Sequence, residues 1–122
     1  MVKRLSALAI AVLTVSTSAM AEPKNREQLQ FELNAKLAGR TLACGDRAGH
    51  ASMRSASREL AKLLPAEQSI SQYMQAFDKR VRLQRKFTSR ASDKHRACQR
   101  VSQQLEKNLG YTQLIAPREG DF

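Results

Sequence analysis

Two cysteines and two histidines are the side chains of this chain best suited to binding zinc: Cys44, His50, His95 and Cys98. Two thiolates and two imidazoles can form a tetrahedral zinc site, and His95 and Cys98 would share one face of a helix. The five residues between Cys44 and His50 are not a usual zinc spacing. In an oxidising compartment the two thiols pair with each other. We therefore predict a disulfide between Cys44 and Cys98, no metal site and no cofactor.

A hydroxyl, an imidazole and a carboxylate also occur close together in the sequence. Ser52 and Ser55 follow His50 and Asp46 within ten residues. Closeness along the chain is not triad geometry, and no G-x-S-x-G elbow accompanies these residues. Asp46 is better explained as a turn or helix-cap residue. No catalytic signature is met, so we predict that the protein is not an enzyme.

The first 21 residues are typical of a secretory signal peptide. Two basic residues precede an apolar stretch from Leu5 to Val15, and Ser18 to Ala21 form an A-x-A-like cleavage site. The apolar stretch is too short to span a bilayer, which takes about 20 residues, and no later segment is long enough. We expect a periplasmic protein with a signal peptide over residues 1–21 and one domain over residues 22–122.

The apolar residues of this domain recur at helical spacing, and no stretch alternates as a strand does. The fold class we predict is all-α, a small four-helix bundle with one disulfide, followed by a C-terminal tail from about residue 111. Capping residues, Pro65 and Gly110 set the expected helix bounds. The four predicted helices are Asn25 to Ala43, Ala51 to Leu64, Ile70 to Arg90, and Ser92 to Leu109.

The first predicted helix has apolar side chains on two sides. Either neighbouring helices cover both sides, or one side is a surface for a partner or for a second copy of the chain. The two sides are formed by Leu29, Leu33 and Leu37, and by Phe31, Ala35, Ala38 and Leu42.

The third predicted helix has an apolar side and a strongly basic side. Without Lys3 and Arg4 the chain has 19 basic and 11 acidic side chains, a formal charge of +8. Export argues against nucleic acid as the partner. The basic side is either a solvated surface or a site for an acidic protein or an anionic surface of the cell envelope. The apolar side consists of Ile70, Tyr73, Met74, Phe77, Val81 and Phe87, flanked by Leu83; the basic side consists of Lys79, Arg82, Lys86 and Arg90, continued by Lys94, Arg96 and Arg100.

The layout of signal peptide, helix, Cys44-Gly45, three further helices and Cys98 early in the last helix resembles the small periplasmic pilotins of type II secretion systems. The resemblance implies a disulfide-tied helical protein that holds a C-terminal secretin helix in an apolar groove with basic residues at its rim. The chain departs from that family in lacking a lipobox cysteine and in its high positive charge. The groove would be lined by residues such as Leu33, Leu37, Phe77 and Val81.

The sequence leaves two other functions open. An immunity protein that neutralises a toxin delivered to the periplasm is also often small, exported, helical and disulfide-bonded, and it binds its target by shape and charge. A binder of an anionic envelope surface is the third possibility, and its affinity should fall steeply with salt, whereas that of a groove binder should change little.

Overall fold

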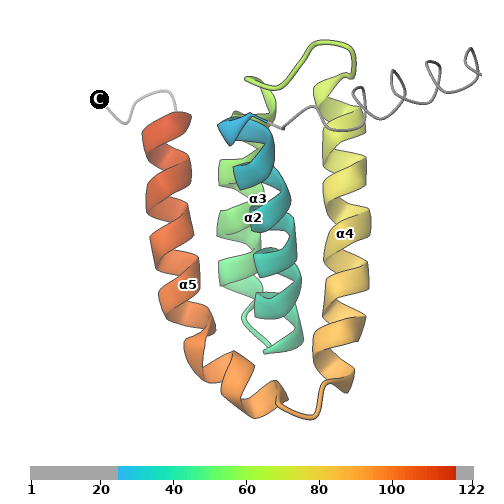
Figure 1. The fold of residues 1–122 in the computed structure, drawn as a ribbon, viewed down its shortest axis with the longest axis vertical. Coiled ribbons are helices and arrows are strands. Elements are labelled where there is room, and N and C mark those ends of the chain that lie inside the picture. Colours follow the sequence, from blue (N-terminus) through green and yellow to red (C-terminus); the bar gives the residue numbers. More distant parts are fainter. Residues whose placement is uncertain (1–24, 118–122) are drawn as a thin grey trace, which may run out of the picture.

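Four packed helices make up the protein, which a computed structural model describes over residues 25–117 (Figure 1). The predicted signal peptide lies outside the described residues. α2 and α3 lie between α4 and α5, and α2 packs most extensively on α4. The predicted all-α fold is thereby confirmed. The helices are α2 (Arg26–Ala43), α3 (Arg47–Ala61), α4 (Ile70–Arg90) and α5 (Lys94–Ile115).

Capping residues fix the starts of α2 and α4 at the predicted positions. The Asn25 side chain accepts a hydrogen bond from the Gln28 N–H at 2.8 Å, and Ser69 accepts one from the Gln72 N–H at 3.0 Å. In both cases the glutamine returns a bond to the cap N–H, which completes a capping box.

Among the described residues, no helix is both long and apolar enough to cross a membrane.

A tight turn joins α2 to α3. Gly45 has φ +84°, its N–H donates to the Leu42 carbonyl, and the Asp46 N–H donates to the Thr41 carbonyl. These two bonds form a Schellman motif, which needs a left-handed residue and therefore favours glycine. The turn places Asp46 to accept a 2.8 Å bond from the Gly49 N–H, so the predicted cap residue is confirmed.

Three predicted helix bounds, in α3 and α5, are wrong. α3 begins at Arg47 instead of Ala51, because Asp46 already caps it, and it ends at Ala61, before Leu64. α5 does not stop before Gly110 but continues to Ile115, so no tail begins at residue 111. The helix continues because Thr112 and Ala116, beyond the glycine, are buried in the bundle.

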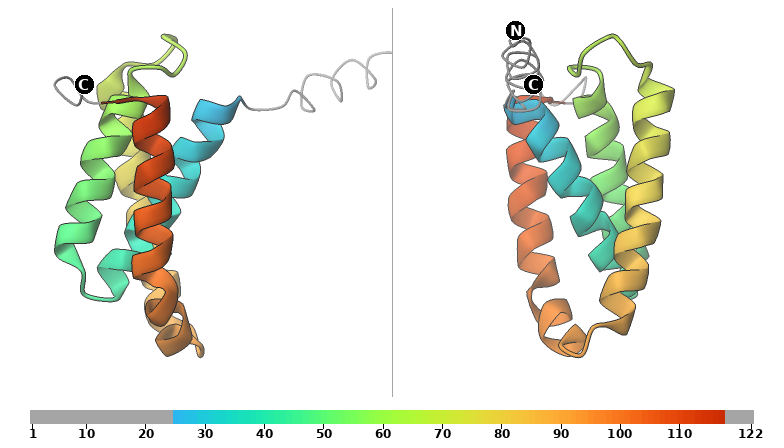
Figure 2. Two further views of the ribbon diagram at one scale, coloured as in Figure 1. Left: turned by 90° about the vertical axis from the view of Figure 1, so that its left-hand side faces the viewer. Right: turned by 45° about the vertical axis from the view of Figure 1, so that its right-hand side comes forward.

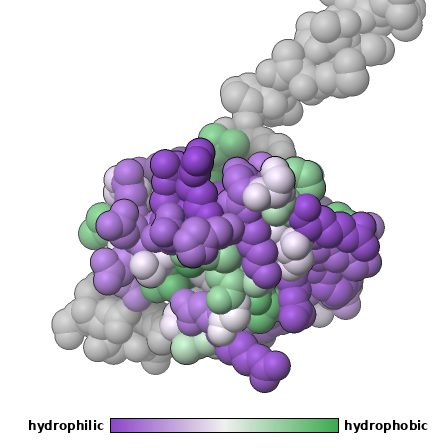
Figure 3. Space-filling model, turned by 90° about the horizontal axis from the view of Figure 1, so that it is seen from below, coloured by the Kyte–Doolittle hydropathy of each residue, from purple (hydrophilic) through white to green (hydrophobic). Residues whose placement is uncertain are grey.

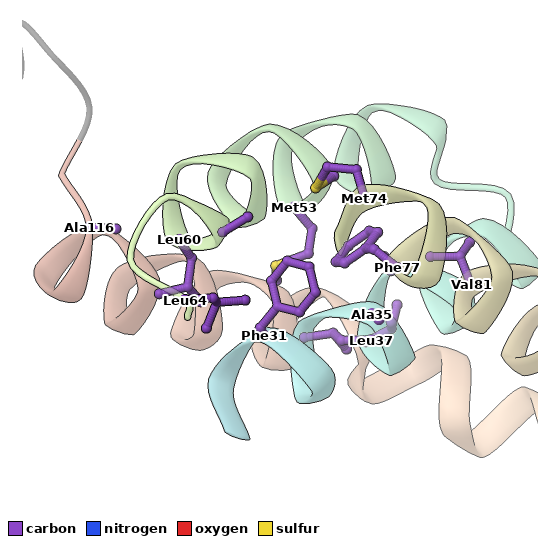
Figure 4. Packing of buried hydrophobic residues seen from close by; sticks show 13 residues of the cluster. Phe31, Ala35, Leu37, Met53, Leu60, Leu64, Met74, Phe77, Val81 and Ala116 are labelled. Carbon is purple, nitrogen blue, oxygen red and sulfur yellow. The ribbon is translucent and has the colours of Figure 1, made fainter. Parts of the chain in front are cut away.

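The hydrophobic core is centred on Phe31 and Phe77, whose ring centroids are 5.4 Å apart (Figure 4). Met53 and Leu60 of α3 are fully buried beside them. Leu37 and Val81 are also buried, although the resemblance to pilotins implied that they line a groove. The apolar side of α4 closes the core against α2, so its inner residues stabilise the fold by burial of apolar surface.

A layer of polar side chains also lies within the bundle. Asn34 is completely buried and donates to Ser57 Oγ at 3.1 Å and to Thr112 Oγ1 at 2.8 Å. Its Oδ1 accepts from Gln30 Nε2 at 2.9 Å, and the same nitrogen donates to Asn108. The layer joins α2, α3 and α5, and it satisfies polar groups that would be costly to bury alone.

Gly39 lies where α2 packs tightly on α4, and its replacement by alanine should destabilise the protein. A Cβ atom there would lie 2.8 Å from the Val81 carbonyl oxygen and 2.6 Å from Gln84 Cβ. Overpacking of this kind costs about 1–3 kcal/mol, since the backbone of α4 must move. Urea unfolding of Gly39→Ala measures this loss. Gly110→Ala is the control, because its Cβ would meet no atom within 4 Å, and alanine there should stabilise the helix by about 1 kcal/mol.

Candidate functional site

A cleft of about 510 Å³, lined by apolar and by polar side chains, opens between α2, α4 and the loop that joins α3 to α4. Phe31, Tyr73 and Phe77 line it, and Phe31 packs edge-on to Tyr73 with centroids 6.1 Å apart. The Tyr73 hydroxyl donates to the Pro65 carbonyl at 2.6 Å, which fixes the loop as one wall. Packing thus holds the three rings in place, and Tyr73 offers most of the aromatic surface that a ligand could contact, because Phe31 is 6% and Phe77 1% exposed.

Charges of both signs surround this cleft. Glu32 and Glu67 lie at its edge together with Lys36 and Arg80. Because the rim is nearly balanced in charge, apolar contact decides what binds there more than long-range attraction does. Ala76 of α4 also lines the cleft and is exposed, so its small side chain leaves the entrance open.

The structure separates the residues predicted to bind a partner. Leu37, Phe77 and Val81 are at most 3% exposed and belong to the core, although Phe77 also forms part of the cleft floor. Leu42 is partly buried against the core, and Leu33 is exposed outside the cleft. Of the predicted apolar set, Phe31 and Phe77 are thus brought together at the cleft.

The sequence prediction missed the Tyr73–Pro65 contact and the loop that carries it. Tyr73 was expected in the apolar side of the helix, yet its hydroxyl needs a polar partner when the ring is buried. Pro65 was interpreted as a helix stop, and its carbonyl supplies that partner. A tyrosine eight residues after a loop proline was the available signal, but chain spacing alone does not specify such a contact.

The predicted basic side of α4 faces solvent: Lys79, Arg82, Lys86 and Arg90 are all exposed. The prediction for two apolar side chains of this helix is wrong, however, because they were expected with its apolar side. Leu83 is 52% exposed and Phe87 is 73% exposed, because they lie on a flank of α4, away from the buried side that Val81 and Thr88 continue. The basic side therefore includes two large apolar side chains on its flank.

The two cysteines are joined to each other, with their Cα atoms 5.6 Å apart. The disulfide ties the end of α2 to the second turn of α5, as predicted. In this arrangement the sulfur atoms are not thiolates available to zinc, and His50 and His95 lie on different helices. Within residues 25–117 no group of three or more His, Cys, Asp or Glu side chains is arranged to hold a metal ion.

A cluster of charged side chains joins α3 to α4. Arg54 donates two hydrogen bonds of 2.8 Å to the Asp78 carboxylate, a bidentate pair that lowers the pKa of Asp78. Burial lowers the pKa of the neighbouring His50; the charges of Arg54 and Arg85 act in the same direction, and Asp78 opposes them. The pair is partly exposed, so its contribution to stability is about 0.5–1 kcal/mol.

This cluster makes stability depend on pH. His50 and Asp78 both have a lower pKa in the folded protein than in the unfolded chain, so the unfolded chain binds more protons. We expect the free energy of unfolding to fall as pH drops through the ordinary value of 6.5 for His50, and again as it drops through and below 3.8 for Asp78. Urea unfolding at several pH values measures both steps. In His50→Gln the upper step should vanish, and its persistence in that variant would contradict the assignment.

Comparison with known proteins adds no relative: no family model, curated protein or solved structure matches this chain.

Proposed function

We propose that the protein is an exported, non-enzymatic interaction module that binds an apolar segment of a cell-envelope protein in the cleft between α2 and α4. The observation that carries the proposal is the open cleft in which the half-buried ring of Tyr73 and the exposed Ala76 lie next to the buried rings of Phe31 and Phe77. A partner side chain inserted there would exchange water for apolar contact, which is the main source of affinity at such sites.

The disulfide supports export, since such bonds persist in oxidising compartments. An amphipathic helix of the partner fits the cleft best, with one or two apolar residues as anchors and polar residues against the mixed rim. Such an adaptor would act as pilotins do towards a secretin helix. The observation that favours an immunity protein instead is the charge of α4, which has six basic side chains and one acidic one.

Photo-crosslinking from the cleft tests this proposal. A photoreactive amino acid replaces Ala76, which lines the cleft, and in a second variant it replaces Gln75, which is exposed outside the cleft. Crosslinking in intact producing cells, followed by mass spectrometry, should give one envelope protein from position 76 and none from position 75. Equal products from both positions would contradict specific binding in the cleft.

A matched pair of charge substitutions then measures the affinity. Binding of the captured segment, made as a peptide, should weaken by at least about tenfold in Ala76→Glu, because the carboxylate closes an apolar entrance. Gln75→Glu adds the same charge outside the cleft and should bind as the unaltered protein does. The affinity should change little with salt, since the contact is apolar. A peptide derived from a toxin would select the immunity function over the adaptor.

A further inference from the structure

The positive charge of this protein is concentrated in one corner of the fold. Residues 79–100 contain nine lysine and arginine side chains and one acidic side chain, so they carry a charge of +8 out of the chain's +10. All nine basic side chains are exposed. Among the described residues, none of them forms an ion pair with a carboxylate. We call this segment the basic corner.

The basic corner lies at the end of the bundle opposite the first turn of α2 and the last turn of α5. It consists of the second half of α4, the turn after Arg90 and the first turns of α5, and it projects past the turn that joins α2 to α3 (Figure 2). Hydrophilic residues cover most of this end, and hydrophobic residues are exposed between them (Figure 3). Because this end projects from the bundle, a broad surface can contact it.

Two large apolar side chains belong to the basic corner. Leu83 and Phe87 are four residues apart on α4, hence on one flank, and both are more than half exposed. Lys86 follows Leu83 by three residues and Arg90 follows Phe87 by three, so each apolar side chain has a cation as its neighbour on the helix. Exposed apolar side chains surrounded by cations are typical of helices that bind in the interface of an anionic bilayer.

We propose that the basic corner binds the surface of an anionic lipid bilayer, with Leu83 and Phe87 entering the interface and the cations contacting lipid phosphates. The charge and the exposed apolar pair both favour a bilayer. A nucleic-acid strand is less suitable, because Phe87 is the single aromatic residue in the segment and strand binding relies on several stacking rings. Bound in this way, the protein would direct its opposite end, which contains the cleft, away from the membrane.

Tryptophan fluorescence tests insertion directly, because the chain has no tryptophan. Phe87→Trp, in the purified oxidised protein, should shift its emission to shorter wavelength with vesicles of phosphatidylglycerol and phosphatidylcholine, and not with phosphatidylcholine alone. Leu114→Trp is the control, since Leu114 is 82% exposed near the far end of α5. An equal shift in both variants would overturn the proposal.

Replacement of lysine and arginine by glutamine tests how much the cations of the basic corner contribute to vesicle binding. Lys86→Gln with Arg90→Gln should weaken partitioning into the anionic vesicles about 25-fold, at roughly fivefold for each charge. Arg58→Gln with Lys62→Gln removes the same charge from exposed positions at the C-terminal end of α3 and should weaken partitioning less than threefold. A similar loss in both double variants, or binding to duplex DNA or an acidic protein without binding to vesicles, would overturn the bilayer assignment.

The test is independent of the cleft. Ala76→Glu should leave vesicle binding unchanged, and the double substitution at Lys86 and Arg90 should leave crosslinking from position 76 unchanged. Failure of vesicle binding therefore overturns the membrane proposal alone. Circular dichroism of each variant confirms that it has folded.

Discussion

Replacing Cys44 and Cys98 by alanine is expected to lower the free energy of unfolding by about 4 kcal/mol. The disulfide closes a loop over a sequence separation of 54 residues, and the unfolded chain gains that much conformational freedom once the bond is absent. For a domain of this size the melting temperature should fall by more than about 15 °C. Thermal and urea unfolding of the double variant, monitored by circular dichroism, measure both quantities.

Loss of the disulfide should destabilise the start of α5 more than any other part of the described chain. No side chain between Ser89 and Arg100 is buried, and the first buried residue of α5 is Val101. The disulfide at Cys98 is thus the main contact that holds residues 89–100 against the rest of the bundle. Repulsion among its unpaired cations favours opening once the tie is removed. Amide hydrogen exchange should therefore accelerate in residues 94–100 more than in residues 105–112.

Reduction of the unaltered protein provides the control for this prediction. It should reproduce the loss of stability seen in the double alanine variant, because both remove the same cross-link. The half-buried sites of the two cysteines make the loss of packing small. A decrease of less than about 1 kcal/mol would show that the loop is already constrained in the unfolded state, contrary to the chain-entropy argument.

The features that follow from local chemistry were predictable from the sequence. Asn25 and Ser69 each precede a glutamine by three residues, and the capping boxes they form fixed the starts of α2 and α4. The pairing of the two cysteines followed from the expected export, because disulfides form in the oxidising compartments outside the cytoplasm. Gly110 misled the prediction of the end of α5 because local propensity favours a stop there, whereas packing of Thr112 and Ala116 continues the helix.

The candidate site depended on tertiary relations that periodicity does not specify. Phe87 follows Val81 by six residues and so lies on a different side of α4, whereas Thr88, seven residues after Val81, continues the buried side. Leu33 and Leu37 share a predicted side of α2, but their burial differs because Leu37 lies deeper within the bundle. Asn34 was absent from every predicted set, since an apolar pattern does not identify a buried polar residue.

Substituting Asn34 by leucine is expected to lower the free energy of unfolding by about 2–4 kcal/mol. Asn34 is completely buried, and leucine would leave Ser57 and Thr112 without their donor. A buried polar group that loses its partner costs about 1–3 kcal/mol. Urea unfolding of Asn34→Leu measures the loss. The control is Gln30→Ala, at the partly buried edge of the same layer. Because water can replace the lost bonds there, we expect Gln30→Ala to lower the free energy of unfolding by about 1 kcal/mol or less.

The triple variant Asn34→Leu, Ser57→Ala, Thr112→Val separates loss of hydrogen bonds from poor packing. If unsatisfied polar groups cause the damage, removing the hydroxyls should restore part of the stability lost in Asn34→Leu, since apolar replacement of both partners is nearly neutral. A triple variant less stable than Asn34→Leu would assign the cost to packing instead. The triple variant could recover stability and yet give broadened NMR signals, which would indicate several packing arrangements. The polar layer would then be what fixes how α2, α3 and α5 align, a role that buried polar groups have in other helical assemblies.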